Sequence, residues 1–129
     1  MLLIYNLLIY FIILLSPLII LFRLLKGKED LSRFKEKFCF FSINNTTKKK
    51  LIWFHGASVG ELLSIIPIIE KLEKNNSIGK ILITSTTLSS SRVLNKYKFK
   101  KTIHQFFPID SIYFTNKFLN YWKPSMAVF

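Results

Sequence analysis

The sequence predicts an α/β protein, in which a parallel sheet covered by helices follows an N-terminal helix that anchors the chain to a membrane. Three observations predict this: the first 22 residues carry no charged side chain, basic residues follow at once, and from residue 51 short apolar strands alternate with helical segments. The 129 residues suffice for one small domain. About eighty remain for its core once the anchor and the segment behind it are set aside.

The apolar N-terminal segment runs from Met1 to Phe22, and only Asn6, Ser16 and Pro17 interrupt it. A helix of about twenty residues crosses the hydrocarbon core of a bilayer, so the length is sufficient. A cleaved signal peptide fits less well, because no basic residue precedes the apolar run and no small-residue cleavage site follows it. A buried core helix is the other alternative. Pro17 is expected to bend the helix because it lacks a backbone donor.

A basic neck follows the anchor, with Arg23, Lys26, Lys28, Arg33, Lys35 and Lys37. Positive charge flanks the cytoplasmic end of a membrane span. We therefore expect the rest of the chain on the cytoplasmic face of the inner (plasma) membrane. Leu31, Phe34 and Phe38 recur at helical spacing among the charges, so the neck is expected to lie along the anionic membrane surface.

The formal net charge of +12 favours an anionic partner such as lipid headgroups, a phosphorylated substrate or nucleic acid. The lysine cluster at Lys96, Lys98, Lys100 and Lys101 accompanies no RNA-binding motif and is expected to be a solvated face, so no nucleic-acid partner is expected. Cys39 is the only cysteine, which excludes an internal disulfide framework and a cysteine-based metal cluster. No metal or cofactor is expected.

Hydrophobic periodicity places the elements of the domain. The expected strands are 51–55, 80–84, 102–107 and 126–129, and the expected helices are 61–74, 91–97 and a third from a cap at Asp110 or Ser111 to Trp122. This alternation predicts a parallel sheet with right-handed crossovers, covered on both faces. The expected divisions are an anchor at 1–25, a basic amphipathic neck and loop at 26–50, and an incomplete domain at 51–129, because the sequence reaches its last residue on a buried strand.

The turn from His55 to Glu61, with the sequence His-Gly-Ala-Ser-Val-Gly-Glu, joins the end of a strand to the start of a helix. Ligands bind at this edge of open α/β sheets, and the helix dipole favours an anion there. A phosphate-binding P-loop is excluded because it needs four residues between its glycines and then a lysine, whereas Glu61 follows Gly60 here; the dinucleotide fingerprint also fails.

A serine hydrolase is a minor alternative. Gly56-Ala57-Ser58-Val59-Gly60 satisfies G-x-S-x-G between a strand and a helix, as in a nucleophile elbow. That fold requires an acid and then a histidine after the serine. His104 is the only downstream histidine, and the acids in between, Glu61, Glu70 and Glu73, all belong to the helix that the elbow opens.

Glu61 is the stronger candidate for chemistry. A carboxylate in the first turn of a helix is stabilised in its charged form, and it can then take a proton from a substrate hydroxyl as a general base. The alternative is a favourable first-turn acid without a chemical role. His55 is interpreted as a hydrogen-bonding residue at a strand end, and Ser58 as a residue that shapes the turn or donates to an acceptor oxygen.

The segment from Ile52 to Glu61, with the proline of the following helix, resembles the bacterial 3-deoxy-D-manno-octulosonic acid (Kdo) transferases of lipopolysaccharide biosynthesis. The most specific motifs are Ser58-Val59-Gly60-Glu61, Ile66-Pro67-Ile68-Ile69, the Thr/Ser-rich run Ile83 to Ser91, Phe107-Pro108-Ile109-Asp110 and Lys123-Pro124. The resemblance covers nearly the whole chain. Gly56 departs from the usual Ala or Ser, and Leu88 and Ser90 replace a usual Pro and Gly.

This resemblance implies the GT-B glycosyltransferase fold, of which the chain would be the N-terminal, Rossmann-like acceptor half, without the donor domain. It implies transfer of Kdo from CMP-Kdo to a hydroxyl of the lipid A precursor (lipid IVA), with Glu61 as proton acceptor. Ser58, Gly60 and His55 would lie on the acceptor side, and CMP-Kdo would bind outside this chain. The chain alone is expected to be inactive. A non-catalytic, membrane-bound lipid-binding or assembly module is the alternative function.

Overall fold

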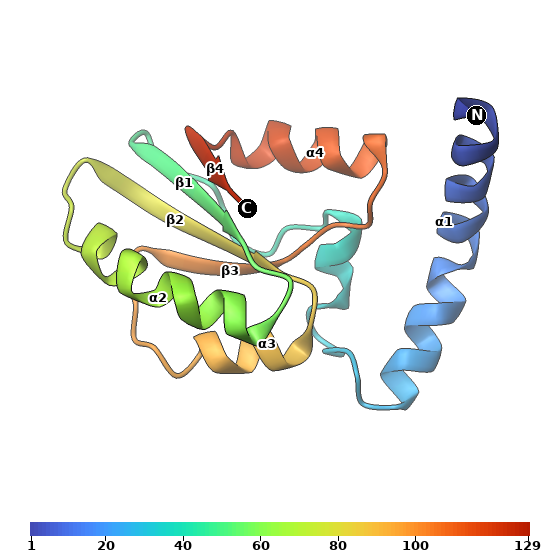
Figure 1. Cartoon of the computed structure of the whole chain (residues 1–129), viewed down its shortest axis with the longest axis horizontal. Coiled ribbons are helices and arrows are strands. Elements are labelled where there is room, and N and C mark those ends of the chain that lie inside the picture. The colour runs from blue at the N-terminus through green and yellow to red at the C-terminus, as the bar shows by residue number, and fades with distance from the viewer.

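The computed structural model describes residues 1–129 and contains an apolar helix, a short neck and an α/β unit (Figure 1). Its elements are α1 (Leu2–Leu25), the 3₁₀ helix η1 (Phe34–Phe38), β1 (Lys50–His55), α2 (Val59–Glu73), β2 (Ile78–Ser85), α3 (Leu88–Leu94), β3 (Thr102–Phe106), α4 (Ile112–Trp122) and β4 (Met126–Val128). The expected α/β class and element order are confirmed. α3 begins three residues before the expected start at 91, because the Thr87 side chain caps it and accepts a hydrogen bond from Ser90 N.

The sheet has the order β3-β2-β1-β4, and every neighbouring pair is parallel. The chain adds β2 and β3 on one side of β1 and then crosses to add β4 on the other side. This is the strand order of a Rossmann-like half, in which the direction of winding reverses between the first and fourth strands. The carboxyl ends of β1 and β4 therefore flank the crevice where such sheets bind ligands.

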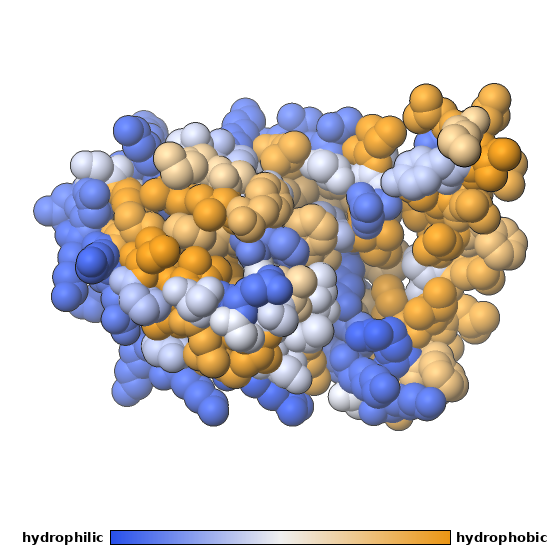
Figure 2. Space-filling model, in the orientation of Figure 1, coloured by the Kyte–Doolittle hydropathy of each residue, from blue (hydrophilic) through white to orange (hydrophobic).

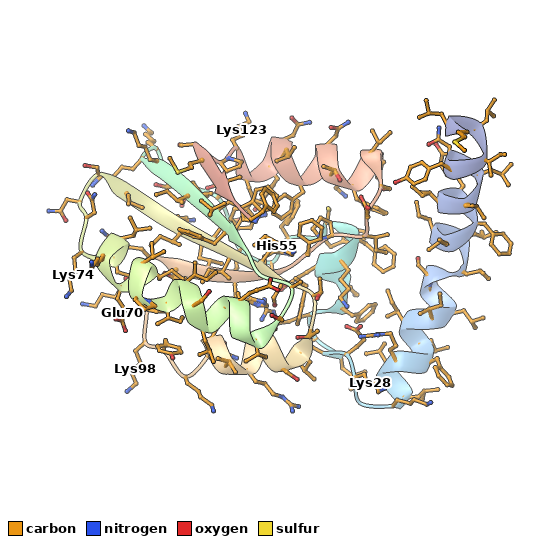
Figure 3. The ribbon with its side chains drawn as sticks, viewed as in Figure 1. Lys28, His55, Glu70, Lys74, Lys98 and Lys123 are labelled. Atoms are coloured by element: carbon orange, nitrogen blue, oxygen red, sulfur yellow. The ribbon has the colours of Figure 1, made fainter.

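Two hydrophobic clusters cover the two faces of the sheet, as a parallel sheet requires. On one face, α2 and α3 pack over a cluster of Phe54, Leu62, Ile66, Ile69, Ile78, Ile81, Ile83 and Leu94. On the other face, α4 and the end of the neck pack over Cys39, Leu51, Trp53, Leu82, Phe118 and Trp122. The labelled lysines of the domain project outward, whereas His55 lies at the centre, where β1 ends (Figure 3).

α1 is long and apolar enough to cross a membrane, and its surface is almost entirely hydrophobic (Figure 2). The helix continues through Pro17 and changes direction along its length (Figure 1). Pro17 lacks the N–H that would bond to the Ile13 carbonyl, and the Ser16 hydroxyl donates to that carbonyl instead, at 2.7 Å. The side chain before the proline thus satisfies the acceptor that the proline leaves free, which favours a helix in an apolar surrounding.

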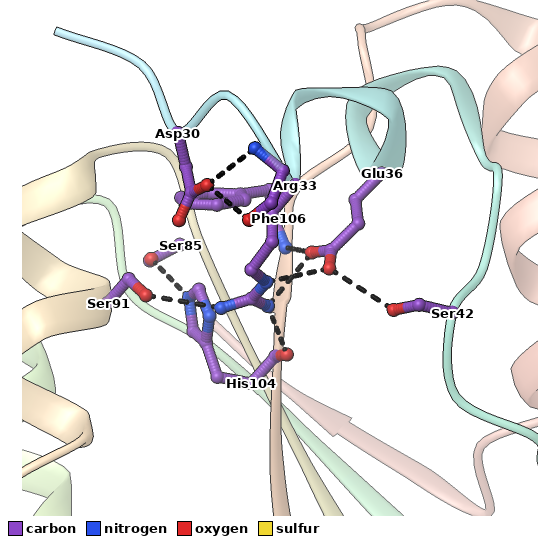
Figure 4. Close-up of polar contacts among 9 residues, drawn as sticks. Asp30, Arg33, Glu36, Ser42, Ser85, Ser91, His104 and Phe106 are labelled. Atoms are coloured by element: carbon purple, nitrogen blue, oxygen red, sulfur yellow. Dashed lines mark hydrogen bonds and ion pairs between the residues drawn. The ribbon is translucent and has the colours of Figure 1, made fainter. Parts of the chain in front are cut away.

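The second half of the neck is folded onto the edge strand of the sheet (Figure 4). Arg33 donates from Nε and Nη2 to the two oxygens of Glu36, at 2.8 and 2.9 Å, and from Nη2 to the His104 carbonyl at 2.7 Å. Glu36 is buried, and its Oε2 also accepts from Phe106 N at 3.0 Å. One carboxylate therefore joins η1 to the end of β3.

A second buried carboxylate, Glu29, links this folded neck to α1. Arg23 Nε of α1 donates to Glu29 Oε1 at 2.6 Å, and Lys37 Nζ of η1 donates to the same oxygen at 2.7 Å. Ion pairs along the neck therefore connect the apolar helix to the sheet. The proposed boundaries at residues 25 and 50 stay predictions.

Candidate functional site

The turn between β1 and α2 is held by a variant of the capping box, in which Glu61 bonds to the residue before the N-cap. Ser58, the N-cap of α2, accepts a hydrogen bond from Glu61 N at 3.2 Å, and Glu61 Oε2 accepts one from Ala57 N at 2.8 Å. Such reciprocal bonds satisfy backbone donors that the helix itself leaves free. The Ser-x-x-Glu spacing at 58–61 is a sequence signature of this motif.

The carboxylate of Glu61 is fully exposed at the carboxyl edge of the sheet. Its pKa lies below the ordinary value, chiefly because Ala57 N donates to it and next because of the Ser58 side chain. Glu61 is therefore ionised at neutral pH. Oε2 accepts from Ala57 N, and because the carboxylate is exposed it can also accept a hydrogen bond from a ligand.

His55 lies beside this carboxylate and is half-buried. Its ring packs against Phe107, with the centroids 4.3 Å apart, and lies 5.9 Å from the ring of Phe129 at the end of β4. Its Nδ1 lies 2.9 Å from Thr84 Oγ1 of the neighbouring strand. Burial lowers the pKa of His55, and the negative charge of Glu61 opposes that effect. The ring is therefore neutral at pH 7 and close to the charge of Glu61.

The geometry of Ser58 does not favour a nucleophile elbow. That motif places its serine on a strained turn with a histidine at its hydroxyl. Ser58 has an ordinary extended backbone, with φ −117° and ψ 161°, and its oxygen caps the helix. Of the two histidines, His55 pairs with Thr84, and His104 Nε2 lies 2.7 Å from Ser85 Oγ.

The two glycines of the turn differ in what surrounds them. A Cβ at Gly56 would lie 2.7 Å from Leu62 Cδ2, so this glycine lets the turn lie close to the buried first turn of α2. A Cβ at Gly60 would meet no atom within 4 Å. Close packing against Leu62 therefore explains why residue 56 is a glycine. Nothing packs against Gly60, so the space next to Glu61 is open.

The structure brings together the four expected site residues His55, Ser58, Gly60 and Glu61, because all four lie on one strand end and the turn behind it. It adds Thr84, Phe107 and Phe129, which sequence reasoning did not assign to the site. The position of Thr84 beside His55 could not be predicted, because it follows from the register in which β1 pairs with β2. No three His, Cys, Asp or Glu side chains form a group that could hold a metal ion.

Comparison with protein families decides the kind of domain that carries this site. The family model of 3-deoxy-D-manno-octulosonic-acid transferase (kdotransferase) matches residues 32–129. The chain belongs to the Kdo transferase family. The match begins in the neck, just before the Arg33–Glu36 pair, and ends at the last residue of the chain.

Individual Kdo transferases support the assignment. The 3-deoxy-D-manno-octulosonic acid transferase of Rickettsia bellii is 41% identical over 111 residues, covering 86% of this chain and 26% of the relative. That of Rickettsia felis is 31% identical, covering 100% of this chain and 38% of the relative. A probable mitochondrial 3-deoxy-D-manno-octulosonic acid transferase of Arabidopsis thaliana is 37% identical over 116 residues, covering 88% of this chain and 26% of the relative.

No solved structure matches the chain significantly. The chain spans 26% to 38% of the length of these three relatives.

Proposed function

We propose that this chain is the acceptor-side part of a glycosyltransferase that moves Kdo from CMP-Kdo to a hydroxyl of the lipid A precursor (lipid IVA), with Glu61 as general base. The observation that carries the proposal is the Glu61 carboxylate. It is exposed and ionised, and it lies at the ligand-binding edge of a Kdo transferase family domain.

The reaction requires one proton acceptor. The oxygen of the acceptor hydroxyl forms a bond to the anomeric carbon of Kdo. The bond from that carbon to CMP breaks, and its electron pair leaves with the phosphate of CMP. The hydroxyl proton passes to Glu61. A carboxylate of lowered pKa is a weak base in the ground state, but the hydroxyl becomes more acidic as its new bond forms, and the transfer then becomes favourable.

The remaining site residues support Glu61 and receive the acceptor. Ser58 holds the first turn of α2, the open space at Gly60 gives the acceptor access to the backbone, and His55 forms the wall on the side of β1. The acceptor carries phosphates, and the N-terminus of α2 favours anionic groups. CMP-Kdo would bind outside these 129 residues, so we propose that the chain alone transfers no Kdo.

The membrane would hold enzyme and lipid acceptor together. We propose that α1 anchors the chain in the inner membrane and that the exposed basic residues of the neck, Lys26, Lys28 and Lys35, face anionic headgroups on the cytoplasmic side. The apolar surface of α1 and the basic residues that follow it support this placement (Figure 2).

A chimera tests the proposed reaction. The segment of the Rickettsia bellii relative that matches this chain is replaced by the chain itself, and Kdo transfer from CMP-Kdo to lipid IVA is measured in membranes. We expect transfer by the chimera and none by the 129-residue chain. A folded chimera that binds vesicles containing lipid IVA but transfers no Kdo would support the non-catalytic lipid-binding alternative instead.

A further inference from the structure

His55 has one ring nitrogen engaged inside the protein and one that is free. Nδ1 lies 2.9 Å from Thr84 Oγ1, whereas Nε2 has no partner in the chain. The ring is half-buried at the end of β1 (Figure 3), and the charge of Glu61 raises its pKa against the effect of burial. Which nitrogen carries the proton decides whether His55 offers a donor or an acceptor beside the base.

The hydrogen bonds of Thr84 bear on that choice. Trp53 Nε1–H donates to Thr84 Oγ1 at 2.8 Å, and an indole can only donate. The hydroxyl proton of Thr84 then has two acceptors within reach, His55 Nδ1 at 2.9 Å and the Phe54 carbonyl at 3.5 Å. The longer distance lies outside the range of good hydrogen bonds between oxygens. The shorter distance favours donation from Thr84 to His55 Nδ1, which would leave the proton of the neutral ring on Nε2.

The surroundings hold this arrangement in place. Thr84 is fully buried, its carbonyl accepts from Gly56 N at 3.0 Å, and the strand register sets it directly beside His55. Trp53 is also buried, and its ring packs near those of Phe107 and Phe118. Because Thr84 is fully buried and Trp53 nearly so, little water competes with the donor–acceptor order that runs from the indole through the hydroxyl to the imidazole.

We propose that His55 presents a fixed Nε2–H as a hydrogen-bond donor to an oxygen of the acceptor headgroup, and that Thr84 is the positioning residue that fixes this tautomer. The inference rests on the proposed function, because it places the donor beside the hydroxyl that Glu61 deprotonates. A free Nδ1–H tautomer would instead present a lone pair at Nε2, which would compete with Glu61 for the same hydroxyl proton. The hydrogen bonds from Trp53 through Thr84 thus make His55 a donor beside Glu61, so that Glu61 alone acts as the base.

The tautomer can be read without any enzymatic reaction. The full 129-residue chain contains two histidines, so a sample labelled with ¹⁵N-histidine in lipid nanodiscs gives two sets of ring signals, and His104→Gln assigns them. We expect the pattern of proton–nitrogen couplings that belongs to Nε2–H for His55. We expect Thr84→Ser to retain it and Thr84→Val to give a mixture of tautomers.

An Nδ1–H tautomer of His55 in the unsubstituted chain would overturn the proposal. So would an unchanged tautomer in folded Thr84→Val. If Thr84→Val does not fold, the unsubstituted chain and Thr84→Ser still decide the result, because both retain the hydroxyl.

The donor role is tested with three probes: lipid IVA, inorganic phosphate and a glucosamine disaccharide without phosphate. We expect lipid IVA to shift the His55 Nε2 resonance. A shift with phosphate alone identifies a phosphate oxygen as the acceptor, and a shift with the disaccharide alone identifies a hydroxyl. No shift with any of the three overturns the proposal.

Kinetics of the chimera separate this inference from the proposed function. The amide nitrogen of glutamine reaches the position of Nε2, whereas that of asparagine does not. We therefore expect His55→Asn to raise the KM for lipid IVA about tenfold, and His55→Gln to restore most of the affinity. Equal KM values in both variants and the unsubstituted chimera would overturn the donor role. A chimera without any Kdo transfer would refute the proposed function while leaving the tautomer result standing.

Discussion

Gly56 and Gly60 are four residues apart in one turn, yet substitution to alanine should affect them in opposite directions. Gly56→Ala places a Cβ 2.7 Å from Leu62 Cδ2 in the core, and should lower the free energy of unfolding by about 1–2 kcal/mol. Gly60→Ala meets no atom and restricts only the unfolded chain, so it should leave stability unchanged or raise it by about 0.5 kcal/mol. Urea denaturation measures both, and equal losses would contradict this account of the turn.

His104 should make the fold sensitive to mild acid. Burial, followed by the charge of Arg33, lowers the pKa of His104 to about 3, whereas the unfolded side chain titrates near 6.5. Between these values the unfolded chain binds the additional proton, so the stabilisation is complete above about pH 6.5 and is lost as the pH falls.

We expect His104→Gln to remove this dependence. Between pH 7 and pH 5 the unsubstituted chain should lose about 2 kcal/mol more than the variant. Denaturation curves at the two pH values give the difference directly. An equal loss in the free energy of unfolding in both proteins would show that His104 is not the group that titrates.

At the level of elements, the sequence predicts the strands and helices of the domain well and the neck poorly. The central strands form continuous apolar runs because the sheet is buried on both faces, and Ser58, Thr87 and Ser111 mark the helix starts as capping residues. The neck is different, because the Glu36 carboxylate can be buried only when Arg33 and Phe106 N donate hydrogen bonds to it. Arg33 is near in sequence, but Phe106 N lies seventy residues away, and no local pattern reveals that contact.

The Arg33–Glu36 pair gives a prediction for the neck. Glu36→Gln leaves the Arg33 guanidinium without its carboxylate and weakens the bond to Phe106 N. We expect a loss of about 3 kcal/mol, at the low end for buried pairs because a quarter of the Arg33 side chain is exposed. Lys35→Gln, an exposed change in the same short helix, is the matched control. A loss no larger than that of the control would mean that the neck is not part of the folded unit.

At the level of the whole molecule, Glu29 decides how α1 is connected to the domain. It bonds to Arg23 on one side and Lys37 on the other, so Glu29→Gln should release the segment between them. We expect severalfold faster tryptic cleavage after Lys26 and Lys28 in nanodiscs. Asp30→Asn serves as the control, because the Asp30 carboxylate bonds to Ser32 and lies near Arg33 but pairs with neither Arg23 nor Lys37. Equal cleavage rates in the two variants would show that the ion pairs do not hold the neck.

The way the strands pair across the molecule limits how much of the candidate site could be predicted from the sequence. Glu61, Ser58, Gly60 and His55 could be named from one motif because they lie in one short turn. Thr84 could not, because its role arises from the pairing of β1 with β2 and from the indole that occupies its acceptor site. The family came from the resemblance to Kdo transferases, which the family match confirms. Residue spacing alone left Glu61 as either a general base or a first-turn acid without a chemical role, with a serine hydrolase as a minor alternative.

The rate of Kdo transfer by the Rickettsia bellii chimera carrying Glu61→Gln tests the central claim most directly. Glu70→Gln is the matched control, because it removes another exposed carboxylate from the same helix. If Glu61 is the general base, Glu61→Gln should lower kcat at least about a hundredfold with little change in the KM for lipid IVA, and Glu70→Gln should leave both values unchanged. A Glu61→Gln chimera that transfers Kdo at nearly the rate of the unsubstituted chimera would contradict the assignment.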